Sequence, residues 1–353
     1  MSSIIKVDTI QLADGTAGTI ENLGLATGAL SHRNLIINGA MQVAQRGTQV
    51  TGITTYGYVT CDRIKTSFGS LGTWTADQST DAPNGFSNSF KITCTTADSS
   101  PASGDIAMLQ YKVEAQDLQH LAFGTSDAKN LTLSFYVKSN KTGSGSLDLR
   151  QIDAGKQFTA GYTISSADTW ERKTISIPAN TSDAIDNNNG NGFQFNFWIN
   201  SGSNYIGGTR NSGWIAYTDN QRNADNLGVG GATSDYWAIT GLQLEVGSVA
   251  TPFEHRSYGE ELARCQRYYQ IFKHRIEDDN GASGRVFFYG YSFLSEMRTA
   301  PTQTTTYDNS SNVNTDQTHF RTFGGKYGFT QGIRETASGN CWAEITNTLD
   351  AEL

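Results

Sequence analysis

The chain has 353 residues, of which 37 are glycines and only 17% are charged, so its polarity comes from Ser, Thr, Asn and Gly. This composition is typical of all-β proteins with many turns, and 6 Trp, 15 Tyr and 17 Phe disfavour a disordered chain. The net charge of -8, with no Lys or Arg run longer than two, disfavours nucleic acid as a partner. No apolar stretch approaches the ~18 residues of a membrane-spanning helix, so no membrane insertion is expected.

Residues 1–33 form a segment that is too short to build a core of its own. Residues 5–12 read as a strand that is followed by a turn. Such a strand becomes ordered only against its own domain, against sister chains or against a docking partner. The apolar side chains expected to make that contact are Ile5, Val7, Ile10 and Leu12.

Residues 34–256 read as many short alternating strands joined by polar turns. In one of them Phe193, Phe195 and Phe197 share a face, while Gln194, Asn196, Trp198 and Asn200 occupy the other, largely polar face. A period of two with one wet face predicts antiparallel sheets packed over a single core, and the number of strands favours a jelly-roll-like β-sandwich. In the last strand, residues 237–247, the apolar set changes parity at Gly241, which predicts a β-bulge there.

Residues 257–276 predict a helical stem. Ser257 is a good N-cap, and Glu260 three residues later completes a capping box. The residues expected on one helical seam are Tyr258, Leu262, Cys265, Tyr269 and Phe272. This stripe fits self-association and the packing of a simple surface helix equally well, because two heptads do not distinguish them.

Residues 277–353 predict a β tip domain. Its strand at residues 286–294 carries large apolar side chains on both faces, so we expect cover on both sides. A module of about 80 residues buries such a strand with difficulty, and oligomerisation is the simplest solution.

The sequence carries no motif of an enzyme, a cofactor site or a metal site, and its five histidines are isolated. The four cysteines lie far apart, which predicts free buried thiols in a chain assembled in a reducing cytoplasm; a bridge between Cys61 and Cys94 is disfavoured. We therefore expect no catalytic residue, no cofactor and no metal.

Several motifs resemble those of bacteriophage tail fibre and virion-appendage proteins. Residues 34–47 resemble the opening motif of that family, and Asp62 and Arg63 resemble its aspartate-arginine-aromatic signature, with Ile64 in place of the aromatic residue. The other segments similar to this family are residues 239–247 (ITGLQLEVG), 250–254 (ATPFE), 265–269 (CQRYY) and 297–301 (MRTAP). The start of the chain, residues 5–11 (IKVDTIQ), looks like the fibre starts of marine cyanophages.

The resemblance implies a homotrimeric virion fibre that is assembled in the host cytoplasm. Residues 1–33 would attach to a tail adaptor, a nozzle or another virion protein, and the C-terminal end would face the host. The motifs themselves read as scaffold, since Arg46 and Arg63 can pair with buried carboxylates such as Asp62. Two alternatives remain: a decoration fibre on the capsid or neck, and a polysaccharide depolymerase.

Adhesion to a bacterial surface glycan or protein is the expected function. Sugar binding needs an aromatic ring beside polar groups, and many weak sites on a trimer add up. The candidate contacts are Trp74, Trp198 and Trp214 in the body, and Tyr289, Tyr291, Arg298, Arg321 and Tyr327 in the tip. For each tryptophan the alternative is a core edge or a subunit contact, and the tip residues could equally form a trimer core. A depolymerase needs two carboxylates that converge across a groove, which the neighbouring pairs at 260–261 and 278–279 do not show.

Overall fold

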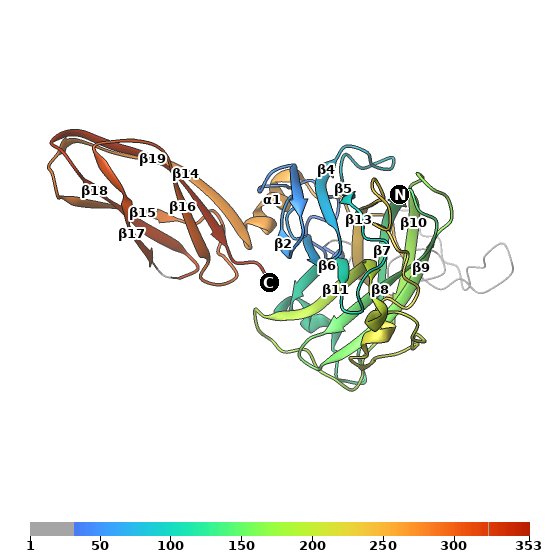
Figure 1. The fold of residues 1–353 in the computed structure, drawn as a ribbon. Coiled ribbons are helices and arrows are strands. Elements are labelled where there is room, and N and C mark those ends of the chain that lie inside the picture. The colour runs from blue at the N-terminus through green and yellow to red at the C-terminus, as the bar shows by residue number, and fades with distance from the viewer. Residues whose placement is uncertain (1–31, 324) are drawn as a thin grey trace, which may run out of the picture. The chain divides into compact units, whose positions relative to one another are not determined.

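The computed structural model describes residues 32–353 except residue 324, and it leaves aside the side chains of residues 315–324. The predictions for Ile5, Val7, Ile10 and Leu12 therefore lie outside the described residues. The chain divides into two compact units (Figure 1). The first unit holds most of the residues up to His255, and the second holds residues 43–47, 61–63 and 256–353.

The first unit is an antiparallel β-sandwich, as predicted, with a jelly-roll-like arrangement of non-consecutive neighbouring strands (Figure 1). Its six-stranded sheet has the order β1 (Gln49–Ile53), β4 (Thr73–Ser79), β5 (Ser89–Thr96), β13 (Tyr236–Val246), β7 (Leu131–Ser139) and β10 (Glu171–Ile177). Its seven-stranded sheet has the order β12 (Ile215–Ala216), β9 (Lys156–Ile164), β8 (Gly143–Gln151), β11 (Asn191–Ser201), β6 (Ile106–Glu114), β3 (Lys65–Gly69) and β2 (Gly57–Tyr58). Short 3-10 turns lie at Ala115–Leu121, Ser203–Tyr205 and Asp219–Gln221.

The core of the first unit lies between the two sheets. Phe135 on β7 meets Phe197 on β11 edge-to-face, with 5.3 Å between ring centroids, and meets Tyr162 on β9 at 5.4 Å. All three side chains are buried. The alternation of the sequence therefore predicts correctly which residues form the core, because side chains two apart on a strand share a face.

The predicted bulge in β13 is confirmed. The pairing of β13 with β7 shifts between Thr240 and Gln243, and Gly241 has a φ of +62°. Before the bulge Trp237 points into the core, and after it Leu244 does. Glycine is suited to this position because a left-handed φ is strained for other residues.

The segment before β1 is fastened to β13 by Asn34. Its side-chain oxygen accepts the backbone N–H groups of Ile36 (3.0 Å) and Leu244 (3.1 Å), and its side-chain nitrogen donates to the carbonyl of Leu242 (3.2 Å). The backbone of Gly39 lies so close to that of Leu242 that a Cβ added to Gly39 would be 2.1 Å from the Leu242 carbonyl oxygen. The opening motif is thus a scaffold that ties the start of the first unit to the middle of its last strand.

The second unit contains one helix, α1 (Tyr258–Gln266), and two three-stranded antiparallel sheets. The first sheet has the order β14 (Tyr269–Gly281), β19 (Gly339–Asp350) and β16 (Thr302–Ser311), and the second has the order β15 (Val286–Ser292), β18 (Gly328–Glu335) and β17 (Val313–Phe323). Two apolar clusters form the core, one around Phe329 and Leu349 and the other around Ile276 and Ile345. The predicted strand at residues 286–294 places Phe287 and Tyr291 against this core.

The predicted helix begins correctly and ends too late. Ser257 accepts the backbone N–H of Glu260 (3.3 Å), as the capping box requires. Tyr269 and Phe272, however, lie on β14, where they pair with β19, so the predicted seam over residues 258–272 is wrong beyond Cys265. The run of aromatic and β-branched residues after α1 favours a strand, and long-range pairing with β19 decides it.

Two arginines from early in the sequence are clamped within the second unit. The Arg46 guanidinium lies 3.6 Å from the ring centre of Tyr269, and Arg63 lies 3.4 Å from that of Tyr268. Both arginines also pair with the carboxylate of Glu352. Cation–π contacts and a shared buried carboxylate together compensate the burial of these charges.

Asp62 lies beside this clamp and is fully buried. Burial raises the pKa of its carboxyl group, against the opposing effects of hydrogen bonds from Gln45 and of the charge on Arg46. The predicted pairing of Arg46 with Asp62 is present at 4.0 Å, whereas Arg63 pairs with Glu352.

The division of the chain differs from the predicted limits at 34–256, 257–276 and 277–353, because residues 43–47 and 61–63 belong to the second unit.

The four cysteines are free and buried. Among the described residues, no helix has the length and apolar character needed to cross a membrane. The same part of the chain contains no group of three or more His, Cys, Asp or Glu side chains placed to hold a metal ion.

We expect Gly39→Ala to destabilise the first unit by about 3 kcal/mol, because the new methyl group would meet a backbone carbonyl that cannot move aside. Thermal unfolding followed by near-UV circular dichroism should show the midpoint falling by about 6–12 °C. Gly104→Ala is the matched control, since an added Cβ there meets nothing within 4 Å. An unchanged midpoint for Gly39→Ala would show that the motif does not fasten the unit.

We expect the second unit to lose stability in acid because of His274, whose ring packs among aromatic rings, 4.3 Å from that of Tyr291. Burial lowers its pKa from 6.5 to about 4. The unfolded chain therefore binds a proton at higher pH than the folded one, so the stabilising contribution is complete above pH ~6.5 and is lost as pH falls toward 4.

Hydrogen exchange of second-unit peptides at pH 7 and pH 5, corrected for intrinsic rates, measures this loss. His274→Phe should make the protection of second-unit amides from exchange less dependent on pH. His120→Gln, at an exposed position of the first unit, should leave that pH dependence unchanged. Equal pH dependence in His274→Phe and the unaltered protein would contradict the assignment.

Candidate functional site

Two of the predicted contact residues, Trp74 and Trp198, are fully buried, so the prediction that they face a ligand is wrong for this structure. The Trp74 indole nitrogen donates to the carbonyl of Leu71 (2.7 Å), and its ring stacks on Phe68 at 5.2 Å. The polar residues on either side of Trp74 in the sequence could not show whether its side chain faces water or is covered by the rest of the first unit.

Trp198 lies on the polar face of β11, as predicted, but that face is covered. The segment between β11 and β13 places Tyr205 at 5.2 Å and the Arg222 guanidinium at 4.8 Å from the indole ring. Its indole nitrogen donates to Asp148 (2.5 Å), which Arg222 approaches to 3.4 Å. A buried polar network therefore replaces the predicted open surface, and the positions of its partners in the sequence gave no local signal.

Trp214 is half-buried. Its ring stacks on Phe193 at 6.1 Å, and its indole nitrogen donates to the carbonyl of Pro178 (2.8 Å). This matches the alternative interpretation, in which the tryptophan covers the edge of the core.

The predicted residues of the second unit do not form one site. Tyr291 is half-buried and packs against the core, and the Arg298 guanidinium donates to the carbonyls of Ala351 (2.8 Å) and Glu352 (3.0 Å). Tyr289 and Tyr327 are exposed, while the side chain of Arg321 lies outside the described residues. Of the predicted trimer residues, Cys265 and Tyr269 are buried, Leu262 is half-buried and Tyr258 is exposed.

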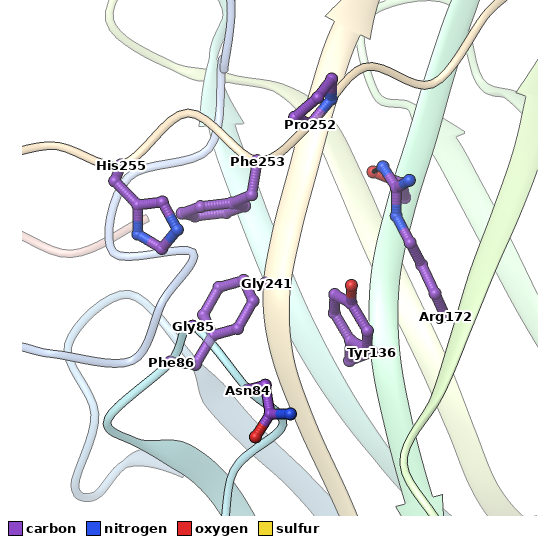
Figure 2. Close-up of a pocket in the computed structure, with 10 residues that line it drawn as sticks. Asn84, Gly85, Phe86, Tyr136, Arg172, Gly241, Pro252, Phe253 and His255 are labelled. Atoms are coloured by element: carbon purple, nitrogen blue, oxygen red, sulfur yellow. Dashed lines mark hydrogen bonds between the residues drawn. The ribbon is translucent and has the colours of Figure 1, made fainter.

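A pocket of about 360 Å³ lies over the six-stranded sheet of the first unit. Figure 2 shows the rings of Phe86, Phe253 and His255 on one side of β13, and Tyr136 and Arg172 on the other side. The remaining lining residues are Asn84, Gly85, Ser134, Gly241 and Pro252. The sequence analysis named none of these residues as a contact.

Aromatic rings form the walls of this pocket. The ring of Phe86 lies 5.0 Å from Phe253, 5.2 Å from His255 and 5.5 Å from Tyr136. All four side chains retain exposure, in contrast to the aromatic residues of the core. The pocket therefore offers apolar ring surface to water, which is the part of a surface that a ligand with an apolar face can cover.

The bulge of β13 provides the floor of the pocket. A Cβ added to Gly241 would lie 2.8 Å from the Phe86 ring and 2.9 Å from the Tyr136 ring. Only glycine lets these two rings approach each other across the strand. Part of this site could be predicted from the sequence, because the change of parity at Gly241 is visible there. The contribution of Phe86 could not be predicted, because Phe86 comes from a distant loop.

Buried polar groups hold the residues that rim the pocket. The Glu245 carboxylate accepts the backbone N–H (2.9 Å) and the hydroxyl (2.6 Å) of Thr251, and Gln243 accepts the backbone N–H of Glu254 (2.8 Å). These bonds fix the segment that carries Pro252 and Phe253. The ITGLQLEVG and ATPFE segments are thus held together by direct hydrogen bonds.

Arg172 supplies the charge of the pocket. One of its terminal nitrogens donates to the carbonyl of Thr251 (2.6 Å) and to the hydroxyl of Ser134 (3.4 Å). Within the described part of the chain no carboxylate forms an ion pair with it. An exposed guanidinium with further N–H groups to donate is suited to hydroxyl or carboxylate oxygens.

No protein-family model matches this chain, and a search of curated proteins finds no match either. Among solved structures, the chain is similar to the enzymatically active domain of tailspike protein 4 of bacteriophage CBA120, with 12% identity, a TM-score of 0.31 and coverage of 61% of this chain. The alignment spans only 21% of the tailspike chain.

Carbohydrate-binding modules also align with this chain. A xylan-binding domain from Paenibacillus barcinonensis shows 8% identity and a TM-score of 0.30, with 63% of this chain and 100% of that domain covered. A family 11 carbohydrate-binding module from Clostridium thermocellum shows 12% identity and a TM-score of 0.28, with 58% and 98% covered. At these values the likeness carries no argument about what this chain binds.

Proposed function

We propose that this chain is a non-enzymatic subunit of a bacteriophage virion fibre, and that it binds a bacterial surface glycan through the pocket over the six-stranded sheet. The observation that carries the proposal is the pocket itself: four partly exposed aromatic rings, an amide and a guanidinium that forms no ion pair within the described part of the chain surround one hollow. The virion role rests on the motifs that resemble phage fibres.

The chemistry of the lining supports a sugar ligand. The apolar C–H face of a pyranose packs on aromatic rings such as Phe86 and Tyr136. Its hydroxyl groups need donors and acceptors at the rim, which Asn84 and Arg172 provide. Such a site is shallow and weak alone, but repeated sites on one particle make the attachment stable.

The lining also supports binding rather than cleavage. Glycoside hydrolysis by the usual route needs two carboxyl groups on either side of the bond that breaks. None of the ten described residues that line the pocket is Asp or Glu. We therefore favour adhesion over a depolymerase.

Exposed apolar residues of the second unit support a homotrimer. Phe288 is 51% exposed, Leu294 62% and Tyr327 55%. No side chain of β15 is fully buried: Phe287 and Tyr291 pack partly buried against the core, and large apolar side chains remain on the surface of the second unit. Surfaces of this kind are often covered by another chain. In the fibre, residues 1–33 would attach to a tail adaptor, a nozzle or another virion protein.

We expect Phe86→Ala and Tyr136→Ala each to weaken glycan binding about tenfold or more, because each removes a ring on which a sugar packs. Binding of the full-length chain to immobilised bacterial surface polysaccharides measures the effect. Tyr56→Ala is the matched control, since Tyr56 is 60% exposed and is not part of the pocket. Binding that survives loss of both rings would place the contact elsewhere.

We expect the purified chain to sediment as a trimer and antibodies to locate it at the tail of intact particles. A single compact chain in solution would contradict the fibre, because exposed side chains such as Leu294 and Tyr327 would then stay in contact with water. Antibody labelling confined to the capsid or neck would favour the decoration fibre. The release of reducing or unsaturated ends from host polysaccharide would favour the depolymerase.

A further inference from the structure

The outer face of the six-stranded sheet continues beyond the pocket as a row of charged and aromatic side chains. Ala238 on β13 pairs with Lys91 on β5 and with Lys138 on β7. The Lys138 ammonium lies 6.0 Å from the ring of Trp170, which precedes β10. On β7, Lys138 is two residues from Tyr136, so this row borders the pocket on the same face of the sheet.

The middle of the row is neutralised by one carboxylate. Lys138 pairs with Asp81 at 2.8 Å, and the indole nitrogen of Trp170 donates to the same carboxylate at 3.0 Å. Burial raises the pKa of Asp81, but these hydrogen bonds and the charges on Lys138 and Lys91 outweigh it, so the pKa is lowered. Asp81 is therefore ionised near neutral pH, and Lys138 has a partner.

Two further cations lie on this face, on β5 and β10, and neither forms an ion pair with a described carboxylate, although the charge of Lys91 also lowers the pKa of Asp81. Lys91 lies 4.4 Å from the ring centre of Tyr236. Its neighbour across the sheet, Asp77, accepts instead from the Gln49 amide at 2.7 Å. The second cation is Arg172, whose two protein hydrogen bonds both start from one nitrogen. On a chain with a net charge of -8, this arrangement marks a face that can attract anions.

The spacing of the strands sets the size of the ligand. Lys91 and Arg172 lie on β5 and β10, which are three strand steps apart in the order β5-β13-β7-β10. Three steps of ~4.8 Å correspond to about 14 Å between the two backbones. Aromatic rings lie between and beside them, at Tyr136 and Trp170. A ligand that reached both cations would be longer than one sugar ring and would carry anionic groups along its length.

We propose that this face binds a carboxylate-bearing polysaccharide, with Arg172 and Lys91 taking carboxylates of different sugar units and Tyr136 and Trp170 packing against the rings. This inference rests on the proposed function and names the class of glycan. A carboxylate suits the Arg172 fork, which can still donate from its other two nitrogens. The pocket holds one unit of the chain, and the row from Trp170 to Lys91 extends the contact.

The test uses the full-length chain and three soluble probes: polygalacturonate, neutral dextran and dextran sulfate. We expect polygalacturonate to bind, dextran to bind weakly or not at all, and the binding of polygalacturonate to weaken as salt rises. Arg172→Gln and Lys91→Gln should each lower affinity for polygalacturonate about tenfold, as expected for the loss of a charged hydrogen bond. Lys129→Gln, which removes the same charge from an exposed loop position, should leave it unchanged.

The outcomes separate this inference from the proposed function. Loss of glycan binding in Phe86→Ala, with no effect of Lys91→Gln or Arg172→Gln and no salt dependence, would overturn the acidic ligand and leave the adhesin intact. Failure of every bacterial polysaccharide to bind would overturn both. Equal binding of dextran sulfate would show that charge density alone is recognised and would overturn the carboxylate class. Lys91→Gln removes no protein hydrogen bond, so it keeps the test valid if Arg172→Gln unfolds.

Discussion

The bulge in β13 is the constraint on which the first unit depends. One extra residue, Gly241, reverses which side chains face the core, and the strand can then bury Trp237 before the bulge and Leu244 after it. The same irregularity exposes the carbonyl of Leu242 to Asn34 and Gly39. It also leaves a floor without a side chain between the rings of Phe86 and Tyr136. Scaffold and pocket thus share one local cause, since a regular strand would fill the hollow.

The sequence predicts those features that depend on local alternation. The β-sandwich, the core residues of β7 and β11 and the bulge are all visible as a period of two and its interruption. The capping box at Ser257 is likewise local. What alternation cannot show is whether the polar face of a strand stays wet. Trp198 and Asn196 share such a face, but Arg222, more than twenty residues later, covers Trp198 and approaches Asp148.

Competition between local and distant partners explains the remaining differences. Tyr269 continues a helical spacing from Tyr258, but it pairs with a residue near the C-terminal end of the chain and becomes part of a strand. Phe86 comes from a loop with no pattern of its own, so the pocket could not be assembled from the sequence. The motif residues Arg46 and Asp62 were correctly expected near each other, whereas the partner of Arg63 lies 289 positions away.

That last separation affects the order in which the molecule can be built during synthesis. Arg46 and Arg63 leave the ribosome early, whereas the carboxylate of Glu352 that both contact is synthesised 306 and 289 residues later. Until then the two guanidinium groups lack this carboxylate, and burying them costs more desolvation free energy. The second unit can therefore reach this arrangement only after Glu352 has been synthesised, although its residues 43–47 and 61–63 are made before most of the first unit.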